Sequence, residues 1–280
     1  MMDLSGEQLK GRLRNLANKN QSDARILLRQ FLMERFLERL SVSEFRDHFI
    51  IKGGTLITAM LGISLRSTMD IDTTITGFNL NEDEAIHIIN QIISIDISDG
   101  ATFKIKKTER IMEGMEYLGI RIYIDSYFKR IYSPLKIDLS TGDVITPGAI
   151  EFGFKKMFEE DNILLLTYNL ETTLGEKIQT ILARGVLNTR MRDFYDIHAL
   201  LNVYGDNIRI DVLKEAFAAT AKKRKTETII ESYDEIINNL AESAEMKKHW
   251  NNYQKKYIYA SEINYETVLN SVKALCFLLS

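Results

Sequence analysis

The spacing of apolar residues predicts helices at the start of the chain. Between Leu27 and Leu40 apolar residues recur every three or four positions, which is the spacing of one helix face. Asp23 stands just before this segment, where a capping residue is expected. Farther upstream, Ser5 and Gln8 have the spacing of a capping box, so a shorter helix is expected to begin there.

Short apolar runs and alternating patterns then predict strands. Some runs are apolar throughout, whereas others alternate apolar and polar side chains with a period of two. Strands are therefore expected over residues 49–51, 69–75, 102–108, 118–126 and 135–139. Two helices are expected between these strands, over residues 55–61 and from a cap at Asn81 to about residue 93.

From about residue 168 onward only the helical spacing recurs. Helices are expected over residues 170–181, 194–201, 212–219, 229–240 and 268–279. Strands mixed with helices, followed by helices alone, indicate an α+β protein with a mixed sheet. We expect a sheet-containing lobe over residues 1–167, which includes N-terminal helices within 5–45, and a helical lobe over 168–280. No Gly-, Ser- or Pro-rich linker separates them, so we expect the lobes to share a cleft.

Composition narrows the class of protein only slightly. The chain has 280 residues and a formal net charge of −3, so its overall charge does not indicate a nucleic-acid binder, although a local basic patch is compatible with it. A single cysteine, Cys276, rules out an internal disulfide framework and fits a reducing compartment. No apolar run approaches the ~20 residues of a membrane span, and no signal segment is recognisable at Met1, so we expect a cytoplasmic protein.

A glycine pair follows the first predicted strand. Gly53 and Gly54 come directly after the apolar run, and Thr55 opens the predicted helix. A glycine turn that leads into a helix presents free backbone N–H groups, and these bind phosphate oxygens. The three residues are therefore candidates for holding the phosphates of a nucleotide.

Two aspartates occupy alternate positions in the second predicted strand. Residues i and i+2 of a strand point to the same face, so Asp70 and Asp72 are expected to lie side by side. Two adjacent carboxylates repel each other unless a cation lies between them, and Mg²⁺ prefers such oxygen ligands. The pair could instead cap a turn or bind Arg66. Arg66 could also contact phosphate, and Thr68 is expected to share the face of Asp70.

A third carboxylate follows on a later strand. Lys136 and Asp138 occupy one face of strand 135–139, and apolar residues occupy the other. If this strand lies beside the one with Asp70 and Asp72, the three carboxylates can hold one or two Mg²⁺ ions. Such ions activate a hydroxyl group and bridge a triphosphate. Taken alone, Asp138 could equally be an exposed carboxylate at the end of a strand.

The predicted helical lobe carries a second group of polar residues. Lys177 belongs to a polar stripe on its helix, and the next helix carries Asp193 and Asp196. Because the connection between these helices is short, they are expected to be antiparallel neighbours, and Lys177 could meet either aspartate. Lys177 would then bind triphosphate as a point charge. The alternative is a solvated face with an ion pair between Arg192 and Asp196.

Taken together, these motifs resemble the AbiEii/AbiGii toxin family. The matching segments are Lys52-Gly53-Gly54-Thr55, Arg66-x-Thr68-x-Asp70-x-Asp72, Lys136-x-Asp138, Thr173-x-x-Glu176-Lys177 and Arg190-x-Arg192-Asp193-Phe194-Tyr195-Asp196. The likeness extends from about residue 5 to at least residue 205. The opening segment, Leu4-Ser5-x-Glu7-Gln8-Leu9-Lys10, is most similar to streptococcal AbiEii. Thr73-Thr74 and Gly175 depart from the usual pattern of the family.

The resemblance implies a DNA-polymerase-β-like nucleotidyltransferase that acts as the toxin of an abortive-infection, phage-defence system. It also implies GTP binding and an AbiEi-like antitoxin that need not bind the toxin. The related MenT toxins transfer nucleotides to the 3′ end of tRNA. By the match of motifs, Asp70 and Asp72 correspond to the metal-binding pair and Lys177 to the catalytic lysine. Either Asp193 or Asp196 corresponds to the essential acid of the last motif.

The leading hypothesis is a magnesium-dependent nucleotidyltransferase that moves a nucleoside monophosphate from an NTP to RNA, with the 3′ end of tRNA expected as acceptor. Its nucleotide-binding residues would be Gly53, Gly54, Thr55, Arg66, Thr68 and Lys136. Its catalytic residues would be Asp70, Asp72, Asp138, Lys177, Asp193 and Asp196. Transfer to a protein, or a GTP-binding regulatory module without catalysis, are the alternatives. The sequence leaves open the NTP, the acceptor and the oligomeric state.

Overall fold

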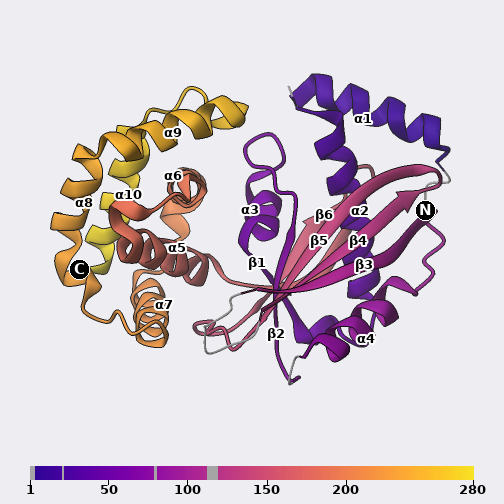
Figure 1. Ribbon diagram of the computed structural model, residues 1–280, viewed down its shortest axis with the longest axis horizontal. Helices are drawn as coiled ribbons and strands as arrows, with labels where there is room; N and C mark the ends of the chain where they lie inside the picture. Colours follow the sequence, from indigo (N-terminus) through magenta and orange to yellow (C-terminus); the bar gives the residue numbers. More distant parts are fainter. Residues whose placement is uncertain (1–3, 21, 79–80, 112–118) are drawn as a thin grey trace. The chain divides into compact units, whose positions relative to one another are not determined.

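The chain divides into two compact units in its computed structural model, which describes residues 4–20, 22–78, 81–111 and 119–280 (Figure 1). The first, here called the sheet unit, comprises Met1–Asp143 and Ile150–Thr167. The second, here called the helical unit, comprises Val144–Ala149 and Tyr168–Ser280. The division into folding domains at residues 167 and 168 stays a prediction, because compactness alone does not establish that either unit folds by itself.

The sheet unit contains a seven-stranded sheet in the order β3-β4-β5-β2-β1-β7-β6. Its strands are β1 (Phe49–Lys52), β2 (Ile71–Ile75), β3 (Ala101–Ile111), β4 (Gly119–Phe128), β5 (Ile131–Thr141), β6 (Ile150–Lys155) and β7 (Asn162–Thr167). β2 runs parallel to β5 and β1 runs parallel to β7, whereas the other neighbours are antiparallel. The mixed sheet confirms the α+β class.

The helices of this unit are α1 (Gly6–Asn20), α2 (Ala24–Ser41), α3 (Gly53–Leu61), α4 (Glu82–Ile93) and the short 3₁₀ helix η1 (Arg46–His48). Three of them, α1, α2 and α4, begin at the predicted caps, whereas α3 begins at Gly53 and not at the predicted Thr55. The capping box of α1 is present, because the Ser5 amide donates to Gln8 Oε1 at 2.8 Å and the Gln8 amide donates to Ser5 Oγ at 3.2 Å. The side chains of Asp23 and Asn81 cap α2 and α4.

The core of the sheet unit lies between the sheet and two helices. α2 and α4 pack against the β3-β4-β5 part of the sheet (Figure 1). Ile120, Ile122 and Ile124 of β4 are fully buried, and each such side chain contributes roughly 1.5–3 kcal/mol. Phe31 of α2 meets Phe128 of β4 edge to face, with ring centroids 5.4 Å apart. Since side chains alternate along a strand, the polar residues between these isoleucines point to the opposite face.

Several elements differ from the sequence-based expectation. β6 and β7 carry no predicted counterpart, although residues 163–166 form an apolar run that is typical of a buried strand. α9 (Ala244–Lys256) was also missed, although its buried residues Met246, Trp250 and Tyr253 have helical spacing. The strand expected from residue 69 begins only at Ile71, so Asp70 precedes it. Residue 118, the predicted first residue of β4, lies outside the described residues.

The helical unit is built from six α-helices and four short 3₁₀ turns in the described part of the chain. They are α5 (Leu170–Arg184), η2 (Gly185–Leu187), α6 (Met191–Tyr204), η3 (Gly205–Asn207), α7 (Ile210–Lys223), η4 (Ile229–Ser232), α8 (Tyr233–Glu242), α9 (Ala244–Lys256), η5 (Ile258–Ala260) and α10 (Tyr265–Leu279). α5 packs against α6 and α7, and α10 packs against α6, α7 and α8. No helix among the described residues is long and apolar enough to cross a membrane.

The surroundings of Gly175 explain why a glycine occupies this position within α5. A Cβ atom at this position would lie 3.1 Å from the backbone nitrogen of Phe217 and 3.3 Å from the carbonyl carbon of Ala216, both in α7. The missing side chain lets the two helices approach closely. Close approach of the α7 backbone therefore explains this departure from the family pattern.

Candidate functional site

The predicted adjacency of the two acidic strands is confirmed. β2 and β5 are parallel neighbours, and their register sets Asp72 directly beside Asp138. The same register continues on the other side of β2, where Lys52 of β1 is the partner of Asp72. Two carboxylates and one ammonium group therefore stem from three adjacent strands of one sheet.

Asp70 lies beside this row but not within a strand. It stands just before β2, so the expectation that Asp70 and Asp72 alternate along one strand is wrong for Asp70. Its carboxylate forms an ion pair with Lys136 of β5, with 2.8 Å between Oδ1 and Nζ. Lys136, predicted to bind nucleotide, thus holds the first carboxylate of the acidic pair.

The glycine pair approaches Asp72 closely. Gly53 and Gly54 are the first two residues of α3 and do not form a separate turn before it. The Gly54 amide donates to Asp72 Oδ2 at 3.0 Å. Gly53 has φ +57°, in the left-handed region, and a Cβ atom there would lie 2.5 Å from Asp72 Oδ2. Glycine is needed here because any side chain would collide with the carboxylate.

Burial raises the pKa of Asp72, and the charges of Asp138 and Asp70 add to this effect, whereas the hydrogen bond from Gly54 and the charge of Lys52 oppose it. The surroundings of Asp72 therefore destabilise the ionised form of its side chain. A cation bound beside it would relieve this repulsion.

Two threonines contact the backbone of Asp70, and an arginine contacts the backbone of Ser67 nearby. The hydroxyls of Thr55 and Thr68 donate to the Asp70 carbonyl oxygen at 2.8 and 3.3 Å. Arg66 is fully buried and donates to the Ser67 carbonyl oxygen. These three residues, predicted to bind nucleotide, contact the backbone of Asp70 and Ser67 beside the acidic pair.

Arg121 is a residue of this group that the sequence did not single out. It lies on β4 in register with Asp138 and grips both of its oxygens, at 2.7 Å from Nε and 2.7 Å from Nη2. The signal was present, because Arg121 is one of the polar residues that alternate with the buried isoleucines of β4. Without the strand order, however, its partner could not be identified.

Lys52 also has partners that the sequence did not reveal. Its Nζ donates to Ser140 Oγ at 2.7 Å and forms an ion pair with Asp143. Ser140 and Asp143 follow Asp138 along the chain, at and beyond the end of β5. The lysine thus ties the start of α3 to the end of β5.

The donor set fits Mg²⁺ through two carboxylates. Asp70 and Asp72 supply hard oxygen ligands, and their mutual repulsion favours a cation. Asp138 already has a two-pronged cationic partner in Arg121, so a metal at Asp138 would have to replace that partner. No group of three or more His, Cys, Asp or Glu side chains among residues 4–20, 22–78, 81–111 and 119–280 is arranged to hold a metal ion. The three-carboxylate site stays a prediction.

In the helical unit, Lys177 lies between two aspartates of the neighbouring helix. Its Nζ is 2.8 Å from Asp193 Oδ1 and 2.8 Å from Asp196 Oδ2. The predicted meeting of α5 and α6 through these side chains is confirmed, and it involves both aspartates. Arg190 completes the group, because its Nε lies 2.8 Å from Asp193 Oδ2. Two positive and two negative charges thus balance in one cluster.

Burial alone would lower the pKa of Lys177, but the charges of Asp193 and Asp196 outweigh it and raise the pKa. Burial would likewise raise the pKa of Asp193, but the charges of Lys177 and Arg190 outweigh it and lower the pKa. At neutral pH Lys177 and Asp193 are therefore both charged, and the two aspartates hold the lysine in one position.

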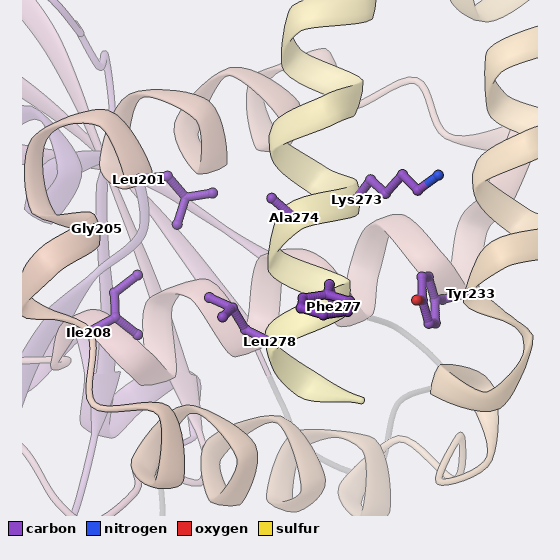
Figure 2. Close-up of a pocket in the computed structure, with 8 residues that line it drawn as sticks. All are labelled: Leu201, Gly205, Ile208, Tyr233, Lys273, Ala274, Phe277 and Leu278. Carbon is purple, nitrogen blue, oxygen red and sulfur yellow. The ribbon is translucent and has the colours of Figure 1, made fainter.

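A separate apolar pocket of about 390 Å³ lies in the helical unit (Figure 2). It is lined by Leu201, Gly205, Ile208, Tyr233, Lys273, Ala274, Phe277 and Leu278. The lining has one charged group, Lys273, and no carboxylate. The pocket therefore lacks the groups that nucleotide chemistry requires, and it is distinct from the residues of the two clusters above.

Comparison with known proteins identifies a family whose pattern matches most of the chain. Residues 35–271 match the family described as "Nucleotidyl transferase AbiEii toxin, Type IV TA system". A crystal structure of a candidate nucleotidyltransferase from H. pylori is similar in fold, with 14% identity, a TM-score of 0.50, and coverage of 90% of this chain and 95% of that chain.

A second structure, of JHP933 from Helicobacter pylori, has 13% identity, a TM-score of 0.49, and coverage of 91% and 93%. A search of curated proteins finds no match.

Proposed function

Because this chain belongs to the AbiEii family of nucleotidyl transferase toxins from type IV toxin–antitoxin systems, we propose that it transfers a nucleoside monophosphate from an NTP to RNA in a magnesium-dependent reaction. The expected acceptor is the 3′ end of tRNA in the cytoplasm, and GTP is the donor that the family resemblance favours. An AbiEi-like antitoxin would counter the toxin, with or without direct contact.

The observation that carries the proposal is the register of β2 and β5. It sets Asp72 beside Asp138, while the amide of Gly54 donates to Asp72 from the start of α3. Carboxylates next to a glycine-led helix are what transfer of a nucleotide requires, because the reaction needs a metal and a grip on phosphate in one place.

In the reaction, a hydroxyl oxygen of the acceptor attacks the α-phosphorus of the NTP, and the bond to the β-phosphate breaks to release pyrophosphate. Mg²⁺, held by Asp70 and Asp72, would neutralise charge on the phosphates. Asp138, oriented by Arg121, is the candidate to accept the proton of the attacking hydroxyl. Backbone N–H groups at Gly53 and Thr55, at the start of α3, are candidates for the triphosphate.

Lys177 is the proposed source of positive charge from the helical unit. Its raised pKa keeps it protonated, and Asp193 and Asp196 hold its ammonium group in place. A lysine fixed in this way loses little freedom when phosphate oxygens approach it. In this proposal both aspartates act as positioning residues.

Incubation of the full chain with each labelled NTP in turn, Mg²⁺ and total tRNA tests the proposal. Label in RNA is expected with wild type and is expected to be lost in Asp72→Asn. Asp125→Asn is the matched control, because Asp125 lies on β4 of the same sheet and contacts Tyr132 and Lys106, which have no part in the proposed site. Sequencing of RNA 3′ ends then identifies the acceptor.

Label in protein alone would overturn RNA as the acceptor and favour transfer to a protein side chain. Absence of any label, together with undiminished toxicity of Asp72→Asn in cells, would overturn the enzyme proposal. Tight GTP binding in that case would indicate a regulatory module.

A further inference from the structure

A group of aromatic residues lies beside the lysine cluster on α6. Tyr195 of α6 packs on Tyr259 with ring centroids 4.7 Å apart, and Tyr259 stacks on Tyr257 at 5.3 Å with an angle of 24° between the rings. Tyr257 in turn packs on Tyr253 of α9 at 4.6 Å, and Tyr253 stacks on Trp250 at 5.4 Å. Five rings thus form one continuous row.

The row runs from the interior to the surface of the helical unit. Trp250, Tyr253 and Tyr195 are buried, whereas Tyr257 and Tyr259 are half-buried and Ile258 between them is 60% exposed. The three buried rings contribute to the core of the helical unit. Packing in the core does not explain why the two outer rings, which stack on each other, remain partly exposed.

Two cations lie over the Tyr257 ring, one of the two outer rings. The guanidinium carbon of Arg192 lies 6.0 Å and Lys256 Nζ lies 5.3 Å from the centre of the Tyr257 ring. Arg192 Nη2 also donates to the Tyr257 hydroxyl at 3.3 Å, and Lys255 is exposed beside Lys256. Aromatic rings accompanied by cations are the usual surface for unpaired bases and their phosphates.

The same helix connects this surface to the lysine cluster. Asp193 and Asp196, which hold Lys177, are one residue away from Arg192 and Tyr195, which contact the outer tyrosines. Both pairs have i,i+3 spacing, so they occupy neighbouring stripes of α6. Both features belong to the helical unit, and α6 and α9 are packed against each other there (Figure 1).

We propose that Tyr257, Tyr259, Arg192 and Lys256 form a stacking surface for unpaired bases of single-stranded RNA. This inference rests on the proposed function, because it assigns the surface that would hold the RNA acceptor. The positive charges complement phosphate, and a stacked ring accepts any base, so the surface recognises single strands and not one sequence.

The test is binding of a fluorescein-labelled oligouridylate to the full chain, measured by anisotropy without NTP or Mg²⁺. Tyr257→Ala is expected to weaken binding about tenfold or more, because it removes a stacking ring. Tyr257→Phe keeps the ring and is expected to restore binding to within about twofold of wild type. An RNA duplex of the same length is expected to bind without this dependence on Tyr257.

Phe277→Ala is the matched control. Phe277 is an aromatic residue of the same unit, 73% exposed at the apolar pocket, with no cation–ring contact among the described residues (Figure 2). This variant is expected to bind RNA like wild type. Trp250, the one tryptophan of the chain, reports through its fluorescence whether the aromatic row stays folded in each variant.

Lys256→Glu provides a second test that does not depend on a ring. Lys256 is exposed, so its replacement should leave the fold intact while weakening RNA binding and making its salt dependence shallower. Unchanged binding in both Tyr257→Ala and Lys256→Glu, or no binding of single-stranded RNA by wild type, would overturn the inference. If labelled RNA still forms in the transfer assay under those results, the proposed function stands and only the stacking surface is wrong.

Discussion

The ammonium group of Lys177 lies 2.8 Å from a carboxylate oxygen of Asp193, and neither side chain is more than about a tenth exposed. A buried charge is tolerated only while its partner is present, because an unpaired charge in the interior has lost its hydration without compensation. The pair is therefore both a candidate part of the reaction and a structural requirement of the helical unit.

Replacing Lys177 with methionine tests both roles. We expect Lys177→Met to lower the free energy of unfolding by about 3–5 kcal/mol, because Asp193 and Asp196 would be left without their common partner. Transfer activity should be lost as well. Urea denaturation measures the first effect, and Lys10→Met is the control, because its ion pair with Glu7 is exposed and should contribute below about 1 kcal/mol. Equal midpoints for the two variants would contradict the structural role.

The pKa of Asp193 predicts how stability depends on pH. The pKa of Asp193 in the folded protein lies below its ordinary value of 3.8. Between these two pKa values the folded protein therefore binds fewer protons at Asp193 than the unfolded chain does. The contribution of Asp193 is therefore present above the unfolded pKa and is lost as the pH falls through the folded pKa. The difference in urea midpoint between wild type and Asp193→Asn should be constant from about pH 7 to about pH 5 and shrink in stronger acid. A difference that grows on acidification would refute the assignment.

The grip of Arg121 on Asp138 predicts a difference between two conservative variants. Arg121→Lys keeps the charge but cannot donate to both oxygens, so Asp138 should be less well oriented and transfer activity should fall by roughly tenfold. Arg121→Gln should fall further. Stability should change by less than about 1 kcal/mol in both, because the pair is partly exposed. Full activity in Arg121→Gln would show that Asp138 needs no orienting partner.

Replacing two glycines with alanine should have opposite effects on stability, because one has a positive φ and the other lies in an ordinary helix. Gly53→Ala should lower the free energy of unfolding by at least about 1 kcal/mol and reduce activity, because φ is +57° and the new Cβ atom would meet Asp72. Gly11→Ala, in α1, should instead raise the free energy of unfolding by up to about 1 kcal/mol. Alanine has the higher helix propensity, and a Cβ atom at this position would meet nothing within 4 Å. Thermal unfolding of both variants decides the matter, and effects of the same sign would contradict this explanation.

Local patterns predicted the types of most elements but not all of their limits. The capping residues Ser5, Asp23 and Asn81 are where a helix start requires them, because capping depends on neighbouring residues alone. Asp70 was placed inside a strand because alternation continued through it. The ladder with β5 begins only at Ile71, and that limit depends on a distant segment.

By itself the sequence determined the α+β class, the main caps, and the two neighbouring helices that carry the lysine cluster. These follow from periodicity and short spacings, which are local properties of the chain. Only the tertiary structure decided the partners: Arg121 for Asp138, Lys136 for Asp70, and both aspartates for Lys177. The order β4-β5-β2 and the packing of α5 on α6 fix these pairs, and both arise from contacts between segments that no local pattern records.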